Sequence, residues 1–300
     1  MAKILICDKM DDDALNEIKS RWDTDVKIGQ TPDELAENVG PYEAVVVRSA
    51  TKVRKPAIDA GTNLKVVVRG GVGIDNIDHE YARSKGIDVR NTPSASSDAV
   101  AELAMAHMFA LARNLHKSNI TMRKGEWLKK QYKGIELAGK TLGIIGIGRI
   151  GQSAAKKANA IGMNVIAFDA FVDKCDLDFV EMKSSMDELL AKSDFVSLHI
   201  PAPNKGYVIG KDELAKMKDG AYLINAARGG TVDEKALLDA LNSGKLAGAG
   251  VDVWEKEPTD NIELASHENV SCSTHLGASS AEAQKRVGTE VISVLAEYFD

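Results

Sequence analysis

The stretch that decides the fold is TLGIIGIGRIG, residues 141–151. Its first half, Thr141–Ile145, is apolar and typical of a buried strand. Its second half fits the pattern G-x-G-x-x-G. A helix-like segment follows at Gln152–Ile161, and another strand-like run comes at Asn164–Phe168. Because strand, glycine turn, helix and strand occur in this order, the stretch predicts a βαβ unit that binds a dinucleotide.

The three glycines have separate tasks in such a unit. Gly146 permits the tight turn, Gly148 lets the backbone approach a pyrophosphate, and Gly151 lets the helix pack closely on the strand. The start of the helix offers free N–H groups and a partial positive charge to the phosphates. We expect Arg149 and Ile150, in the same turn, to lie along the pyrophosphate.

Asp169 indicates which dinucleotide is bound. It ends the second strand, eighteen residues after Gly151. A carboxylate there accepts hydrogen bonds from the adenosine ribose hydroxyls and repels a 2′-phosphate. Two other interpretations exist: Asp169 as a helix N-cap, and Arg149 as a ligand of a 2′-phosphate. The spacing favours NAD as the cofactor.

Outward from this unit, apolar runs alternate with helix-like segments, which predicts an α/β protein with parallel sheets. Before it, strands are expected at Ile4–Ile6, Ala44–Val47 and Leu64–Val68, with helices at Asp11–Ser20, Pro32–Asn38 and Lys55–Ala60. After it, strands are expected at Phe195–His199, Ala221–Asn225 and Gly248–Asp252.

Two long helical segments interrupt or end the alternation. One runs from Ser96 to about Lys124 without a strand, and we expect a single helix that bridges two lobes. The other, Ser279–Asp300, is amphipathic and ends the chain. The predicted domains are a substrate-binding domain at residues 1–95, completed by the helix at 280–300, and an NAD-binding domain at 96–279.

Composition limits the class of protein. The 300 residues are 44% hydrophobic and 27% charged, with a formal net charge of −6. That balance argues against a protein that binds nucleic acid through a basic face. No apolar run approaches the roughly 20 residues of a membrane span. The three cysteines have no metal-ligand spacing, so we expect no metal, three buried and reduced thiols, and a cytoplasmic location.

Three polar residues follow the ends of predicted strands in the second half of the chain. They are Arg228, Glu257 and His275. Ligands of open α/β sheets bind beyond the carboxyl ends of the strands, so these side chains can converge on one site. Considered singly, each is more often a structural residue than a catalytic one.

Further motifs occur in a fixed order along the chain: LHIP at 198–201, NAARG at 225–229 with VDE at 232–234, GVDV at 250–253 and HLGA at 275–278. With the glycine turn, they resemble the NAD-dependent D-isomer-specific 2-hydroxyacid dehydrogenases over nearly the whole chain. Two more, RSAT at 48–51 and GVGIDNID at 71–78, are most similar to members that oxidise D-3-phosphoglycerate. The resemblance implies two lobes with doubly wound sheets, a Rossmann-type NAD domain being inserted into a flavodoxin-like substrate domain.

The resemblance also implies a reaction, the oxidation of D-3-phosphoglycerate to 3-phosphohydroxypyruvate in serine biosynthesis. His275 would remove the proton of the C2 hydroxyl as hydride leaves for NAD. Glu257 would hold the imidazole and stabilise its protonated form. Arg228 would bind the substrate carboxylate or carbonyl oxygen, for which a planar guanidinium suits better than Lys.

Other residues acquire expected roles in the same way. Asp252 would contact the nicotinamide carboxamide, and the rest of the cofactor site would include Val100, His199, Ile200, Pro201, Ala226, Ala227, Arg228, His275, Gly277 and Ala278. The backbone of Gly71, Val72 and Gly73 would receive the substrate carboxylate, with Asn76 nearby, while Arg48, Ser49 and Arg69 would bind the phosphate. A homodimer formed through the NAD lobe is expected, and the C-terminal regulatory domain of many members is not.

Two alternatives stay open. A glyoxylate or hydroxypyruvate reductase would use Arg228, Glu257 and His275 without depending on Arg48. An NAD-sensing transcriptional corepressor would share the fold and bind a peptide in its first lobe. The first differs in substrate, and the second is a binding protein rather than an enzyme.

Overall fold

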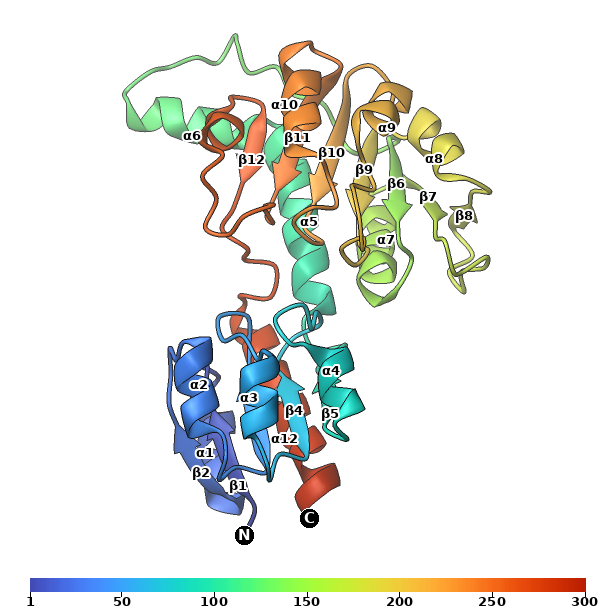
Figure 1. Ribbon diagram of the computed structural model, residues 1–300. Coiled ribbons are helices and arrows are strands. Elements are labelled where there is room, and N and C mark those ends of the chain that lie inside the picture. The colour runs from blue at the N-terminus through green and yellow to red at the C-terminus, as the bar shows by residue number, and fades with distance from the viewer. The chain divides into compact units, whose positions relative to one another are not determined.

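The computed structural model describes residues 1–300, and the chain divides into two compact units (Figure 1). The first unit comprises Met1–Ser96 and Ala278–Asp300, and the second comprises Ser97–Gly277. These boundaries differ by one or two residues from the predicted domains, 1–95 with 280–300 and 96–279.

The first unit contains a five-stranded sheet in which every pairing is parallel. Its order is β2-β1-β3-β4-β5, which is the flavodoxin-like order. The central strands are buried on both faces because helices cover both, so they read as continuous apolar runs such as AVVV in β3. The strands are β1 (Lys3–Ile6), β2 (Asp23–Val26), β3 (Ala44–Val47), β4 (Val66–Arg69) and β5 (Asp88–Asn91).

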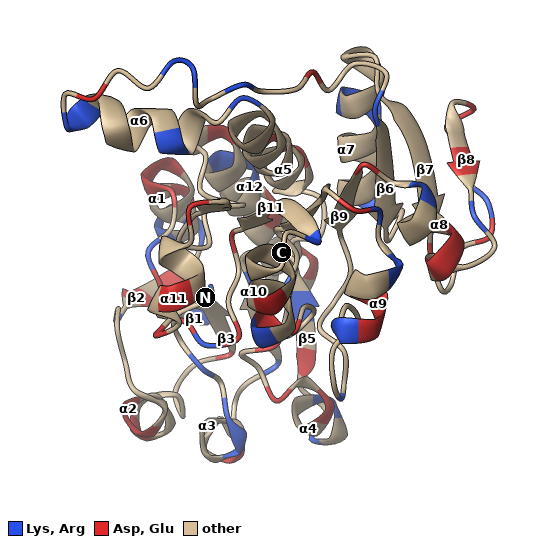
Figure 2. Cartoon of the chain, turned by 90° about the horizontal axis from the view of Figure 1, so that it is seen from above, with Lys and Arg blue, Asp and Glu red and all other residues tan.

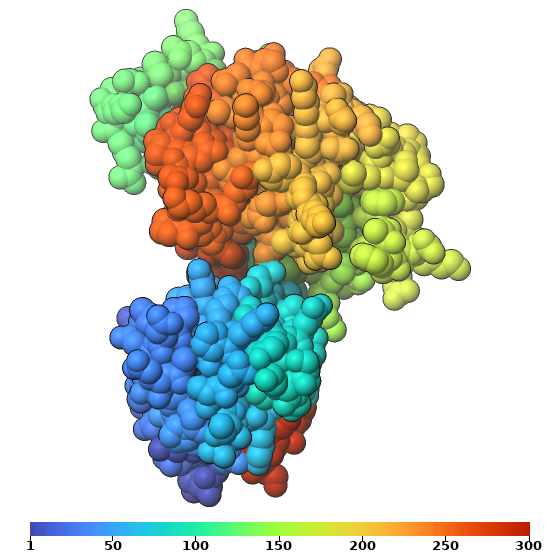
Figure 3. All heavy atoms as spheres, in the orientation of Figure 1, coloured from blue at the N-terminus to red at the C-terminus, as the bar shows by residue number.

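Helices cover the two faces of this sheet unequally. On one face α1 packs with the C-terminal helix α12, which brings the end of the chain back to its beginning (Figure 1). In the space-filling view, the C-terminal residues in red lie against the blue and cyan residues of the first unit (Figure 3). Gly288 of α12 permits this approach, since a Cβ there would lie 2.4 Å from the Cβ of Ala14. On the other face lie α2, α3 and α4. The helices are α1 (Asp12–Arg21), α2 (Pro32–Asn38), α3 (Lys55–Ala60), α4 (His79–Ser84) and α12 (Ala281–Phe299).

The second unit contains a seven-stranded sheet, also parallel throughout. Counted from β6, its order is the Rossmann order with a seventh strand added at one edge. The strands are β6 (Thr141–Ile145), β7 (Asn164–Phe168), β8 (Val180–Met182), β9 (Phe195–Leu198), β10 (Ala221–Asn225), β11 (Leu246–Val251) and β12 (Val270–Cys272).

Two apolar clusters fill the space on either side of this sheet. Residues of α5 and α7 form one with the strands, and residues of α8, α9 and α10 form the other. The parallel, doubly wound architecture predicted from the sequence is therefore confirmed. The helices are α5 (Ser97–Ala112), α6 (Leu115–Arg123), α7 (Arg149–Ala160), α8 (Met186–Lys192), α9 (Lys211–Lys216), α10 (Glu234–Asn242) and α11 (Ile262–Ser266).

The single helix predicted from Ser96 to Lys124 is wrong. Asn114 adopts a left-handed backbone conformation with φ of 52°, and it separates α5 from α6. An asparagine tolerates this conformation better than most residues do, so the helix is interrupted there. The two pieces differ in environment, because α5 buries nine residues and α6 buries none.

Three further observations concern the surface. Both basic and acidic residues lie on the helices of each unit, although α6 carries only basic ones and α2 only acidic ones (Figure 2). None of the helices combines the length and apolar character that crossing a bilayer requires. All three cysteines are free, but the prediction that each is buried was wrong: Cys7 is buried, Cys175 is partly exposed, and Cys272 is exposed at the end of the edge strand β12.

Candidate active site

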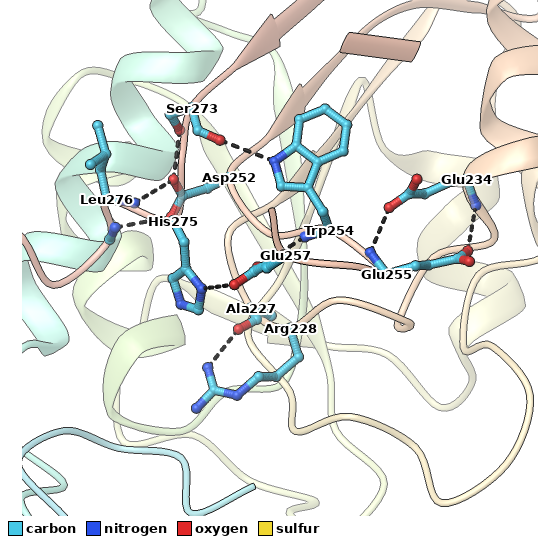
Figure 4. A network of polar contacts seen from close by, with 11 residues as sticks. Ala227, Arg228, Glu234, Asp252, Trp254, Glu255, Glu257, Ser273, His275 and Leu276 are labelled. Carbon is cyan, nitrogen blue, oxygen red and sulfur yellow. Dashed lines mark hydrogen bonds and ion pairs between the residues drawn. The ribbon is translucent and has the colours of Figure 1, made fainter. Parts of the chain in front are cut away.

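The structure brings His275 and Glu257 together in the second unit (Figure 4). The imidazole Nδ1 lies 2.8 Å from Glu257 Oε2, and the backbone N–H of Trp254 donates to Glu257 Oε1 at 3.1 Å. Both oxygens of the carboxylate are thus engaged. A carboxylate accepts at Nδ1, so Nδ1 carries a hydrogen and Nε2 is left to exchange a proton with a ligand. About two fifths of each side chain is exposed, at 40% and 39%.

The environment keeps Glu257 ionised. Partial burial acts to raise the pKa of its carboxyl group. The hydrogen bond and positive charge of His275, the Trp254 N–H and the charge of Arg228 outweigh burial, and the pKa lies below its ordinary value. With the ionised carboxylate on Nδ1, the free Nε2 of the ring is placed to take up a proton from a substrate.

Asp252 holds the loop that carries His275. Its carboxylate accepts from the backbone N–H groups of Leu276 at 2.7 Å and Gly277 at 2.9 Å, and from Ser273 Oγ at 2.6 Å. Its own carbonyl accepts from the His275 N–H at 2.8 Å. These bonds hold His275 in a left-handed conformation with φ of 58°, which is uncommon outside glycine. The predicted contact of Asp252 with the nicotinamide stays a prediction.

Arg228 lies in the turn after β10, on the same side as the pair (Figure 4). Asn225 shapes that turn, because its side chain accepts from the Ala227 N–H and donates to the Arg228 carbonyl, each at 3.2 Å. The Thr231 hydroxyl donates to the same carbonyl at 2.6 Å. The guanidinium Nη1 donates to the Ala227 carbonyl at 2.7 Å. The structure therefore places the three predicted catalytic residues on neighbouring loops at the carboxyl end of one sheet.

A reciprocal contact anchors the loop of Glu257, and the sequence reasoning missed it. Glu234, at the start of α10, accepts from the Glu255 N–H at 2.6 Å, while Glu255 accepts from the Glu234 N–H at 3.1 Å. Asn261 also donates to Glu234, at 2.7 Å. The motif VDE was noted as a family signature, but its spacing gave no indication of this partner.

The glycine turn has the predicted geometry. Gly146 has φ of 93°, and a Cβ there would lie 2.6 Å from the His199 carbonyl oxygen. A Cβ at Gly151 would lie 2.1 Å from the Gly146 carbonyl oxygen, so only glycine lets α7 pack against β6. Around Gly148 there is no atom within 4 Å of such a Cβ. Helix α7 starts at Arg149 without a side-chain cap, which leaves its first N–H groups for a ligand.

The residues around this turn fit a dinucleotide. The Asp169 carboxylate accepts from the N–H groups of Ile147 and Phe171, each at 2.9 Å, and is partly exposed. A carboxylate has further acceptor positions for two ribose hydroxyls. The Nδ1 atom of His199 is buried without a hydrogen-bond partner, while Nε2 lies 3.0 Å from Ser197 Oγ. An orphaned polar atom beside an open glycine turn is what a site for a polar ligand would present.

The other predicted cofactor residues lie on several elements. Val100 is buried on α5, and its side chain would lie 3.2 Å from a Cβ at Gly277. Ala226 and Ala227 are buried, Ile150 and Ile200 are partly exposed, and Arg149 and Pro201 are exposed. Ala278 belongs to the first unit, where its carbonyl accepts from Gln284.

In the first unit, Arg48 is a cation without a carboxylate partner. Its guanidinium Nη1 donates to Gln284 of α12, and its Nε is buried without a hydrogen-bond partner. Burial lowers the pKa of Arg48, although the negative charge of Asp8 opposes that change. A partly buried guanidinium without an ion pair is suited to an anionic ligand.

Two polar residues fix the backbone of the loop Arg48–Thr51. Asp8, buried at the end of β1, accepts from the N–H groups of Arg48 and Thr51 and from the Thr51 hydroxyl. Asn76 donates to the carbonyls of Arg48 and Thr51 at 2.7 and 2.6 Å. Asn76 was predicted to lie near the substrate, and the structure gives it this scaffolding contact. Asp8 was missed.

The loop predicted to bind the substrate carboxylate lies after β4. Gly71 has φ of 145°, and a Cβ there would overlap the Arg69 guanidinium, which folds back over the loop. The Val72 carbonyl accepts from the Asn91 side chain at 2.5 Å. Val72 and Gly73 are partly exposed and Ser49 is exposed. No group of three or more His, Cys, Asp or Glu side chains is arranged to hold a metal ion.

Comparison with known proteins identifies the family of the chain. Residues 105–277 match the model of the D-isomer-specific 2-hydroxyacid dehydrogenase NAD-binding domain. A D-3-phosphoglycerate dehydrogenase of Methanocaldococcus jannaschii is 45% identical over 294 residues, 97% of this chain and 56% of that protein. A hydroxypyruvate reductase of Thermotoga maritima is 49% identical over 266 residues, 87% of this chain and 86% of that protein.

Solved structures agree with this result. A glyoxylate reductase from Paecilomyes thermophila superposes with a TM-score of 0.91 at 32% identity, over 100% of this chain and 95% of that one. The chain spans about half the length of the phosphoglycerate dehydrogenases it matches.

Proposed function

Because the chain belongs to the D-isomer-specific 2-hydroxyacid dehydrogenases, we propose that it oxidises D-3-phosphoglycerate to 3-phosphohydroxypyruvate with NAD. The observation that carries the choice of substrate is Arg48, a guanidinium with a buried Nε and no ion-pair partner. A phosphorylated substrate supplies the anion that this group lacks. The M. jannaschii relative, named a D-3-phosphoglycerate dehydrogenase, supports the same choice.

In the proposed reaction each residue of the second unit has one task. His275 Nε2 removes the proton of the C2 hydroxyl, and Glu257 stabilises the resulting imidazolium through its 2.8 Å contact with Nδ1. Arg228 binds the carboxylate or the developing carbonyl oxygen. NAD held by the glycine turn Gly146–Gly151 and Asp169 would supply the acceptor for the hydride of C2. The backbone of Gly71–Gly73 and Arg48 in the first unit are proposed to bind the carboxylate and the phosphate of the substrate.

One alternative has an observation in its favour. The T. maritima relative, of which the chain covers 86%, is named a hydroxypyruvate reductase. Such an enzyme would retain His275, Glu257 and Arg228 and would make no use of Arg48. The two functions therefore share a mechanism and differ at one anion-binding residue.

The experiment that tests the proposal is a substrate panel read by NADH fluorescence at alkaline pH. The oxidation panel contains D-3-phosphoglycerate, D-glycerate, D-lactate and 2-hydroxyglutarate, and hydroxypyruvate with NADH is assayed in the reverse direction. We expect turnover of phosphoglycerate and its loss in His275→Ala. Turnover of glycerate and hydroxypyruvate instead would replace the proposal with the reductase. Silence across the panel, with peptide binding, would favour the corepressor-like protein.

The setting of the reaction is part of the same proposal. Oxidation of phosphoglycerate would place the protein in serine biosynthesis. Three free cysteines, one of them exposed, are consistent with a reducing cytoplasm.

We also propose that the protein acts as a homodimer joined through the segment around α6. No residue of α6 is buried, and the segment around it exposes several large apolar side chains. They are Phe109 at 41%, Leu115 at 56%, Ile120 at 55%, Met122 at 50% and Trp127 at 76%. Clustered exposed apolar side chains mark interaction surfaces, and the expected occupant is the same segment of a second copy.

A further inference from the structure

A network of buried and partly buried polar groups leads from helix α5 to the loop of the proposed catalytic histidine. His107 lies on α5 and is buried, with 5% of its surface exposed. Its ring nitrogens contact two hydroxyls, Nδ1 at 2.9 Å from Ser271 Oγ and Nε2 at 3.0 Å from Ser273 Oγ. Ser273 then donates to Asp252 at 2.6 Å. The reaction proposed above makes no use of His107.

Hydrogen-bond counting fixes the direction of each contact in this chain. The Ser273 hydroxyl has one proton, which goes to the Asp252 carboxylate, so its oxygen accepts from His107 Nε2–H. A neutral imidazole then accepts at Nδ1, and Ser271 is the donor there. Burial lowers the pKa of His107, although Asp252 acts in the opposite direction, and the neutral ring agrees with this assignment.

The sequence makes room for His107 at Gly250 of β11. A Cβ at Gly250 would lie 2.7 Å from the His107 Cβ and 3.1 Å from its Cγ. Only glycine therefore lets this ring approach the strand and reach both serines. Asp252 lies two residues beyond Gly250. Its carboxylate accepts from the Ser273 hydroxyl and from the N–H groups of Leu276 and Gly277.

We propose that His107 and Ser273 are positioning residues, which orient the Asp252 carboxylate and through it the loop Ser273–Gly277 that carries His275. The loop contains a non-glycine residue at positive φ, and such a conformation persists only where surrounding contacts hold it. Each hydroxyl and ring nitrogen of this hydrogen-bond network has a partner. None of these side chains can rotate without leaving a buried polar group unsatisfied. The inference rests on the proposed role of His275.

The test compares His107→Leu, Ser273→Ala and the double variant. Amide hydrogen exchange is measured at Leu276 and Gly277, together with kcat and KM for the substrate of the wild-type protein. We expect both amides to exchange at least tenfold faster in each single variant, kcat to fall about tenfold and KM to change less than threefold. The kcat of the double variant should fall no further than that of the worse single variant, since both substitutions interrupt the same hydrogen-bond network. His107→Gln, which keeps a donor and an acceptor, should restore most of kcat.

Ser193→Ala is the matched control. Ser193 is fully buried in the second unit, and its hydroxyl donates to the Leu189 carbonyl at 2.7 Å without contact to Asp252. The Ser193→Ala substitution should lower the free energy of unfolding. It should not change the amide exchange rates of Leu276 and Gly277 relative to those of β6. Unchanged exchange in Ser273→Ala, or additive losses in the double variant, would overturn the proposal. Faster exchange with unchanged kcat would support the positioning network and count instead against His275 as the base.

Discussion

At the scale of single residues, the groups proposed to contact substrate are oriented by polar neighbours. Glu257 holds His275, Asn225 shapes the turn of Arg228, and Asp8 with Asn76 fixes the backbone at Arg48. The sequence placed the proposed catalytic side chains after strand ends, which is a local property. It did not indicate Asp8 or Asn225 as supports, because a support is defined by a partner elsewhere in the chain.

Arg48 supplies the first prediction. Arg48→Ala is expected to raise KM for D-3-phosphoglycerate at least a hundredfold, because a charge-assisted bidentate contact to phosphate contributes about 3 kcal/mol. KM for an unphosphorylated hydroxy acid should change less than threefold. Steady-state kinetics with both substrates measures the difference. Arg54→Ala is the control, since Arg54 belongs to the same unit but pairs with Asp78 at 2.8 Å. Equal effects of Arg48→Ala on both substrates would remove the phosphate assignment.

His199 predicts a pH dependence of stability. Burial lowers its pKa to about 4, from an ordinary value of 6.5. The unfolded chain therefore binds this proton more readily, and the free energy of unfolding falls as pH drops from about 6.5 toward 4. His199→Gln, which cannot titrate, should lose about 1–2 kcal/mol less than the wild type between pH 7 and pH 5. Urea unfolding at both pH values measures this. Identical losses in the two proteins would mean that His199 titrates normally in the folded state.

At the scale of elements, the strands that the sequence predicted are the interior strands of the two sheets. The four it missed, β2, β5, β8 and β12, are the edge strands. An interior parallel strand is buried on both faces and is therefore a continuous apolar run, whereas an edge strand such as DTDV in β2 is partly exposed and polar. The break at Asn114 escaped prediction because both flanking segments are good helix formers.

The glycine turn supplies a prediction at this scale. Gly151→Ala places a Cβ 2.1 Å from the Gly146 carbonyl oxygen, so α7 must move away from β6. We expect a loss of about 3 kcal/mol or more in stability and undetectable NAD binding. In Gly148→Ala the new Cβ meets no atom within 4 Å, so the variant should fold normally. Its affinity for NAD should fall at least tenfold if the pyrophosphate approaches the backbone there. Thermal unfolding and NADH fluorescence titration separate the two effects. Normal NAD affinity in Gly148→Ala would place the pyrophosphate elsewhere.

At the scale of the whole molecule, the chain leaves its first unit after Ser96 and returns to it at Ala278. Helix α12 makes this return. The sequence predicted it as an amphipathic helix, and its apolar face packs with α1. The apolar side chains around α6 are only partly covered within one chain, which is why oligomerisation belongs at this scale.

The dimer proposal predicts a change in mass. The wild-type protein should sediment at twice the chain mass of 32.2 kDa. Ile120→Asp, which puts a charge on a side chain that is 55% exposed on α6, should shift the protein to monomers with unchanged thermal stability of the single chain. Ile262→Asp is the control, since Ile262 is 64% exposed on α11. A wild-type protein that sediments as a monomer at assay concentration would contradict the proposal.

The sequence by itself determined the architecture and the cofactor turn of this protein. Buried parallel strands, helix signals and G-x-G-x-x-G are local patterns, because each depends on residues only a few positions apart. Only the tertiary structure decided which polar groups support the site. Glu234 and Glu255 are 21 residues apart, and His107 and Ser273 are 166 apart. Such contacts depend on strand order and helix packing, which bring distant segments together and leave no periodicity in the sequence between them.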